Sequence, residues 1–259
     1  MSKVLLPLGV IAVLFGIWEV LAQTGALADL LGIRESVSEA IVPAPSDVAQ
    51  ALWEDREILA DNGWITLQEI LGGLAIAFVL GPGFAIALHL SETLRRAFYP
   101  ILLASQTIPI VAISAVLVIW LGFGIGPKLA VIALICFFPI TVNMLDGLRS
   151  VDPSAVRMMR TLDGSRAVIL RRLELPSAMP QFFTGAKIAV VIAPIGAFLG
   201  ELVGANGGLA FLITQANANL LTARVFAAIT VLSAFALTLF LLIIVAERAV
   251  APWGRKELR

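Results

Sequence analysis

The sequence has little charge and almost none of the residues from which enzyme and metal sites are usually built. Charged residues make up 14% of the chain, and there is one histidine, His89, and one cysteine, Cys136. A metal site of histidine and cysteine ligands is therefore not expected, and an intrachain disulfide is excluded. No Gly-Lys pair occurs, so the phosphate-binding loop G-x-x-x-x-G-K-[ST] is absent, as is a G-x-S-x-G nucleophile elbow. These absences argue against an enzyme, and against ATP hydrolysis by this chain.

The sequence instead contains long apolar runs. Hydrophobic residues make up 59% of the chain and the mean hydropathy is +0.98, whereas a soluble domain carries about 25% charged residues. A length of 259 residues leaves room for about six spans of about 20 residues each. Acidic and basic residues balance at 18 each, so no nucleic-acid partner is expected. We expect an all-α, polytopic membrane protein with one transmembrane domain over residues 1–259.

The apolar runs predict six spans and the segments that join them. The expected spans cover residues 4–21, 64–90, 98–121, 129–148, 179–199 and 225–245. The third is expected to break at Pro109, because proline frees backbone carbonyls inside a helix. The first continues beyond the short apolar core of a signal peptide, so we expect it to be uncleaved. The expected connections are a polar segment, 24–63, with an amphipathic helix over 47–59; a tight turn, 122–128; a loop, 150–178; and a glycine-rich connection, 201–223.

The basic residues predict the orientation of the chain, since they concentrate on the cytoplasmic side of membrane proteins. With the N-terminus in the cytoplasm, thirteen of them fall on the inner side, among them the five arginines of the loop 150–178. Four fall on the outer side: Arg34, Arg56, Lys128 and Arg224. Both termini and the loop 150–178 are therefore expected to be cytoplasmic, and the segment 24–63 extracytoplasmic.

Several polar residues fall within the expected spans, where such residues line a pathway or pair with one another. Gln106 lies beside the Pro109 break, Asn143 follows a proline by four residues, and Glu201 begins the glycine-rich connection. These three are pathway candidates, and hydrogen bonds between helices are the alternative. The remaining four could lie at interfaces or, for the lysine, pair with a carboxylate; they are Glu19, Glu69, Asp146 and Lys187.

The loop 150–178 contains signals for two helices. Asp152 or Ser154 can cap a first helix, and a second is expected over 165–174, ended by the proline at 176. Met158 and Met159, if exposed on the first helix, would suit the groove of a partner protein. A helix lying on lipid headgroups would suit the same residues, and the sequence leaves both interpretations open.

At this loop the chain resembles the permease subunit of a binding-protein-dependent ABC importer. The family pattern is E-A-A-x-x-x-G, nine residues, then I-x-L-P, and Leu173-Glu174-Leu175-Pro176 matches its end. Counting back places Arg157, Met158 and Met159 at the E-A-A positions and Asp163 at the glycine, with Gly164 displaced by one residue. The beginning of the motif therefore departs from the family.

The nitrate/sulfonate/taurine-type branch of these permeases is similar along nearly the whole chain. The matching stretches include Val42-Pro43-Ala44-Pro45-Ser46, Thr107-Ile108-Pro109, Ile119-Trp120-Leu121-Gly122-Phe123-Gly124, Asp146-Gly147-Leu148, Val151-Asp152-Pro153 and Gly200-Glu201. Within the branch, Gln215-Ala216-Asn217-Ala218 and Val225-Phe226-Ala227-Ala228-Ile229 resemble permeases for thiamine pyrimidine precursors or riboflavin.

The resemblance implies a permease homodimer in a bacterial inner membrane, with two cytoplasmic ATPase subunits and an external binding protein. ATP and Mg²⁺ would bind the ATPase, and this chain would hold no cofactor. A coupling helix would comprise Ser154, Arg157, Met158, Met159, Arg160, Leu162, Asp163, Gly164 and Ser165. The pathway would include Gln106, Thr107, Pro109, Asn143 and Glu201. Alternatives are an importer of sulfonate, taurine or nitrate-type anions, an ATP-independent secondary transporter, and a membrane-tethered scaffold.

Overall fold

The computed structural model describes residues 2–25, 43–204 and 206–254, and within these ranges the chain is helical without a strand. The all-α prediction is therefore confirmed. The chain divides into two compact units, Met1–Thr66 with Asn206–Leu232, and Leu67–Ala205 with Ser233–Arg259. Residues 26–42 of the predicted polar segment and the basic tail 255–259 lie outside the described residues.

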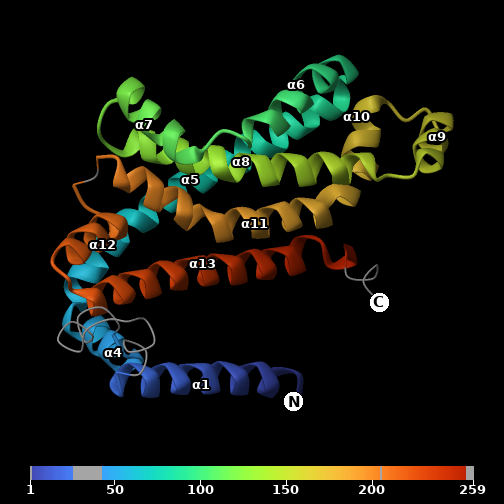
Figure 1. Cartoon of the computed structure of the whole chain (residues 1–259). Helices are drawn as coiled ribbons and strands as arrows, with labels where there is room; N and C mark the ends of the chain where they lie inside the picture. The colour runs from blue at the N-terminus through green and yellow to red at the C-terminus, as the bar shows by residue number, and fades with distance from the viewer. Residues whose placement is uncertain (1, 26–42, 205, 255–259) are drawn as a thin grey trace. The chain divides into compact units, whose positions relative to one another are not determined.

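The first unit contains α1 (Ser2–Gln23), α4 (Pro45–Glu54), the beginning of α5 (Arg56–Leu90), α12 (Leu209–Ala218) and the beginning of α13 (Thr222–Val250). α1 lies beside α4 (Figure 1). The backbone N–H and hydroxyl of Ser46 both donate to the Glu19 carboxylate, at 3.0 and 2.7 Å. Asp55 accepts two hydrogen bonds from Arg224, at 2.6 and 2.7 Å. Polar contacts between distant residues thus hold the helix ends of this unit.

Two predictions for this unit are wrong in detail. The amphipathic helix expected over 47–59 is divided at Asp55, and α5 begins at Arg56 rather than at 64. The helix begins earlier than predicted because an apolar run indicates only the part of a helix that lies in lipid. The polar turns before that run are helical as well. The glycine-rich connection 201–223 contains α12, whose first N–H groups are capped from α5: Asn62 Oδ1 accepts from Gly208 at 2.9 Å, and Thr66 Oγ1 from Leu209 at 2.8 Å.

The second unit is organised around α8 (Ile125–Arg149) and α11 (Leu175–Leu202), which lie side by side (Figure 1). Glycines allow the two backbones to approach closely. A Cβ at Gly185 would lie 2.5 Å from the Pro139 carbonyl oxygen, and one at Gly147 would lie 2.9 Å from Ala178 Cα. The buried core beside this contact comprises Ala85, Leu88, Met144, Leu145, Leu148 and Ala178.

The predicted break at Pro109 is confirmed. α6 (Glu92–Ser105) and α7 (Ile110–Leu121) are bent by 103° across it. The expected tight turn 122–128 is shorter, because α8 already begins at Ile125. Gly122 and Gly124 adopt φ of 75° and 128° and end the preceding helix, and Pro127 occupies the first helical turn, where no backbone N–H is needed.

The loop 150–178 contains α9 (Pro153–Thr161), α10 (Arg166–Ile169) and a π-helical turn, η1 (Leu170–Glu174). The second loop helix was expected to end at Pro176, and this prediction is wrong, because α11 begins at Leu175 and continues through that proline. The wider π turn directly before Pro176 displaces the backbone carbonyl that the ring would otherwise meet. The fifth span therefore begins earlier than the predicted residue 179.

Among the described residues, four helices are long and apolar enough to cross a membrane, and the bent pair α6–α7 makes a fifth if it counts as one span. The four are Arg56–Leu90, Ile125–Arg149, Arg166–Leu202 and Thr222–Val250. The remaining predicted span, 4–21, falls within α1, whose apolar part Gly9–Gln23 is shorter. These helices agree with a polytopic membrane protein.

Candidate functional site

The first helix of the loop, α9, is capped by Asp152. Its Oδ1 accepts a hydrogen bond of 2.8 Å from the backbone N–H of Ser154, and Pro153 occupies the first helical position. Interaction with the side chain and the backbone N–H of Ser154 lowers the pKa of Asp152. Of the two candidate caps that the sequence offers, Asp152 is the one used.

No residue of α9 is buried. The side chains of Met158 and Leu162 are 66% and 70% exposed, and Arg157 and Arg160 are exposed beside them. Large apolar side chains that stay exposed at the end of a short helix gain little packing energy from their own unit. This surface therefore suits a partner protein or a lipid surface.

The end of α9 explains how the altered motif still makes a tight turn. The N–H of Gly164 donates to Met159 O at 2.9 Å, and the N–H of Asp163 donates to Arg160 O at 3.1 Å. These two bonds form a Schellman motif, in which the left-handed residue is usually glycine. Here Asp163 takes that conformation, with φ 55°. Gly164 is needed next to it, because a Cβ there would lie 2.6 Å from the Met159 carbonyl oxygen.

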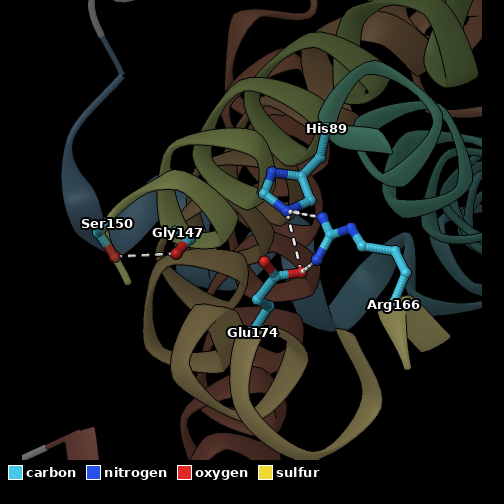
Figure 2. Close-up of polar contacts among 5 residues, drawn as sticks. All are labelled: His89, Gly147, Ser150, Arg166 and Glu174. Carbon is cyan, nitrogen blue, oxygen red and sulfur yellow. Dashed lines mark hydrogen bonds and ion pairs between the residues drawn. The ribbon is translucent and has the colours of Figure 1, made fainter. Parts of the chain in front are cut away.

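At the base of the loop, three charged or ionisable side chains join α10 and η1 to the last turn of α5 (Figure 2). Arg166 Nη1 lies 2.6 Å from Glu174 Oε2, and His89 Nε2 lies 3.0 Å from the same oxygen. Arg166 Nη2 lies 2.9 Å from His89 Nε2. The Glu174 side chain is 5% exposed, so its charge needs these partners.

Polar anchors also hold the flanks of the loop. Ser150 Oγ donates to Gly147 O at 2.8 Å at the end of α8 (Figure 2). The indole N–H of Trp253 donates to Pro176 O at 3.2 Å. A cavity of about 560 Å³ lies between these anchors and is lined in part by Asp152, Arg172 and Gln181. α9 is thus an exposed helix carried on a fixed base.

The five predicted pathway residues occupy different environments. Gln106, Thr107 and Pro109 are exposed at the α6–α7 break. The Asn143 amide is partly buried and donates to Pro139 O of its own helix at 2.8 Å. Glu201 is 2% exposed, near the end of α11. The three residues at the break are neighbours in the sequence, whereas Asn143 lies in α8 and Glu201 in α11.

Sequence reasoning missed one group of residues. Lys128 was assigned to a turn, yet it is 8% exposed and its Nζ lies 2.5 Å from Glu69 Oε1 in α5. Its Cα also faces Gly200, the residue before Glu201. Glu69, a carboxylate inside an apolar run, was the signal in the sequence that a buried pair exists. Its lysine partner could not be identified, because it lies 59 residues away. By contrast, the predicted alternative that Lys187 pairs with a carboxylate is confirmed, because it lies 2.9 Å from Glu247.

Comparison with known proteins gives consistent matches. The family described as "Binding-protein-dependent transport system inner membrane component" matches residues 73–255. A probable ABC transporter permease protein of Haemophilus influenzae is 36% identical over 238 residues, covering 92% of this chain and 93% of that protein. The formylaminopyrimidine transport permease protein ThiX of Halalkalibacterium halodurans is 40% identical over 192 residues, covering 74% and 77%.

A solved structure shares the fold. A chain of the inward-facing methionine ABC transporter MetNI superposes with a TM-score of 0.63 and 20% sequence identity. The match covers 75% of this chain and 97% of that one.

The turn after α9 yields a prediction. Asp163→Gly removes the Cβ penalty of the left-handed conformation, about 1 kcal/mol, and should slow hydrogen exchange of the α9 amides. Gly164→Ala should have the opposite effect, since its Cβ would meet the Met159 carbonyl oxygen. Hydrogen exchange followed by mass spectrometry on the purified protein measures both. Equal exchange in the two variants would contradict the assignment of this turn.

Proposed function

The chain belongs to the family of binding-protein-dependent transport system inner membrane components, and from this premise we propose that it carries a thiamine pyrimidine precursor or a related heterocycle such as riboflavin. It is a multi-pass, non-catalytic permease subunit of an ATP-driven importer in the bacterial plasma membrane. Such a subunit works with a separate ATPase chain and an external binding protein.

The proposed contact with the ATPase is α9. The observation that supports it is the exposure of Met158 and Leu162 on a helix whose base is fixed by Glu174. Flexible apolar side chains of this kind fill a groove on a partner. Closure of an ATPase pair would move α9, and the anchored base would pass that movement to α11. The proposal places the loop 150–178 and both termini in the cytoplasm and assembles two permeases as a homodimer.

Arg157, at the first position of the motif, affects which ATPase groove α9 can bind. The family pattern has a glutamate there, so the charge on α9 is reversed at this point. We therefore also propose that the groove of the partner ATPase carries residues that compensate for this reversed charge.

The proposed pathway contains Gln106, Thr107, Pro109, Asn143 and Glu201. Exposed polar groups at the α6–α7 break support the first three, because a broken span is tolerated where it faces protein or water. The candidates include one carboxylate and otherwise neutral groups, which suits a neutral or zwitterionic heterocycle. An anion of the sulfonate, taurine or nitrate type is the alternative.

For the coupling contact, we predict that Met158→Asp abolishes ATP-driven uptake and prevents copurification of the cognate ATPase, because it places a charge in an apolar groove. Met158→Leu is the matched control and should retain both. Proteoliposomes with the ATPase inside and loaded binding protein outside provide the measurement. Uptake that survives in the aspartate variant, or without ATP, would contradict α9 coupling, and the latter would favour a secondary transporter.

For the pathway, Asn143→Ala or Glu201→Gln should lower the uptake rate severalfold while the ATPase still copurifies. The physical reason is that each change removes a polar group from the proposed route without touching α9. The same proteoliposome assay, with ATPase content measured on each sample, separates the two effects. Wild-type uptake in both variants would rule out these two residues as part of the route.

For the substrate, the cognate binding protein should bind formylaminopyrimidine or riboflavin in preference to taurine, as measured by calorimetry on the purified protein. The identity to the formylaminopyrimidine permease supports this order. Binding of taurine or another sulfonate, with none of either heterocycle, would overturn the substrate proposal and leave the permease assignment intact.

A further inference from the structure

The cavity of about 560 Å³ beside the loop base lies where three helices that could cross a membrane end. The residue after α8, Ser150, lines it, as do Pro176 and Ser177 in the first turn of α11 and Trp253 just after α13. All of these residues belong to the second unit. Because membrane helices end at the level of the lipid headgroups, the cavity is expected at that level of the bilayer.

Close contacts fix the wall of the cavity that follows α13. The indole N–H of Trp253 donates to Pro176 O at 3.2 Å, and the side chain remains 47% exposed. A Cβ at Gly254 would lie 2.7 Å from Pro180 Cγ, so the chain here approaches α11 closely. Tryptophan is enriched where a membrane protein passes from lipid to water. The fixed position of Trp253 thus agrees with a cavity at the headgroup level.

Two arginines at this level lack a partner of opposite charge. Arg172 lines the cavity and also a second one of about 410 Å³, which Arg171 lines as well. Both lie in η1, directly before α11, and both are exposed. Neither forms an ion pair with a carboxylate of the residues that the structure describes, whereas Arg166 pairs with Glu174. Arg171 and Arg172 are therefore available to an anion from outside the chain.

The neighbouring helix ends add positive charge. Arg149 ends α8 and Arg248 lies in the last turn of α13; both are exposed and, within the described ranges, have no ion pair. The nearby carboxylates do not balance this charge. Glu247 is already paired with a lysine, Asp152 caps α9, and Asp146 is a single exposed carboxylate. The ends of these helices thus attract anions.

We propose that the cavity beside the loop base binds the headgroup of an anionic phospholipid, with Arg172 and Arg171 as the ligands of its phosphodiester. The guanidinium group matches phosphate oxygens in a bidentate geometry. Ser177 can donate a further hydrogen bond, because its hydroxyl has no partner among the described residues. Basic pockets between membrane helices bind such headgroups. This inference concerns the permease alone and does not depend on the transported solute.

The surface beside the cavity favours a lipid over a soluble anion. Leu241, Leu242 and Val245 of α13 are exposed large apolar residues in the part of the helix that leads to Trp253. A phospholipid can place its phosphodiester at the arginines and its acyl chains along this apolar surface. A soluble phosphate or an acidic segment of a partner ATPase would use only the charged part.

The test is thermal unfolding of the full-length permease in detergent with rising concentrations of short-chain phosphatidylglycerol or phosphatidylcholine. Phosphatidylglycerol should raise the unfolding midpoint in a saturable way, because a ligand that binds the folded state stabilises it. Arg172→Gln should weaken the apparent affinity by about fivefold, the effect expected for one arginine beside an anionic headgroup. Equal stabilisation of the wild type by the two lipids would overturn the proposal.

Arg248→Gln is the matched control, because it removes an exposed, unpaired arginine at the end of a neighbouring helix that lines neither cavity. It should weaken the affinity for phosphatidylglycerol less than Arg172→Gln does. Equal weakening in the two variants would indicate a diffuse attraction of charge and would overturn a defined site.

Two further measurements distinguish the other occupants. Inorganic phosphate that stabilises the wild type as much as phosphatidylglycerol does would assign the cavity to a soluble anion. Loss of ATPase copurification in Arg172→Gln, with unchanged affinity for phosphatidylglycerol, would assign it to the ATPase. Either result would overturn the proposal.

Native mass spectrometry of the wild type keeps the proposal testable if Arg172→Gln fails to fold. The protein should retain phosphatidylglycerol in preference to phosphatidylcholine when both are present in equal amounts. Retention without preference would contradict the site.

Discussion

Close approach of α8 and α11 sets the geometry of the second unit. Glycines at 147, 185 and 200 allow backbone to lie against backbone along the pair. At one end, this approach brings α11 against Lys128; at the other, it fixes the helix from which the π turn and the loop 150–178 extend. In a lipid environment, where apolar surface gives helices little reason to associate, such contacts between small residues are a main source of cohesion.

The chain handles charge in its membrane helices by pairing it. Lys187 meets Glu247 in a balanced and partly exposed pair, and the loop base places Glu174 between Arg166 and His89. Lys128 and Glu69 form a further pair, which is buried in the interior of the second unit.

The loop 150–178 shows how a motif can change while its geometry persists. A helix with a Schellman end needs a left-handed residue followed by a close backbone approach. Asp163 provides the first and Gly164 the second, so displacement of the glycine by one residue leaves the turn intact. The other changes fall on α9 itself, where Arg157 and Met158 are exposed. The turn at the end of α9 is therefore kept although the motif before it has changed.

The amino-acid sequence by itself determined the helical membrane class and the break at Pro109, and it limited the cap at the start of α9 to Asp152 or Ser154. These features follow from local properties, namely apolar run length, proline geometry and capping residues. Only the tertiary structure decided where helices begin and end, as α5 extends before residue 64, α11 passes through Pro176, and α12 is capped by Asn62 and Thr66. It also decided that Lys128 lies in the interior beside Glu69. Helix packing sets which residues distant in sequence become partners, and the apolar pattern of a sequence carries no information about which charges meet.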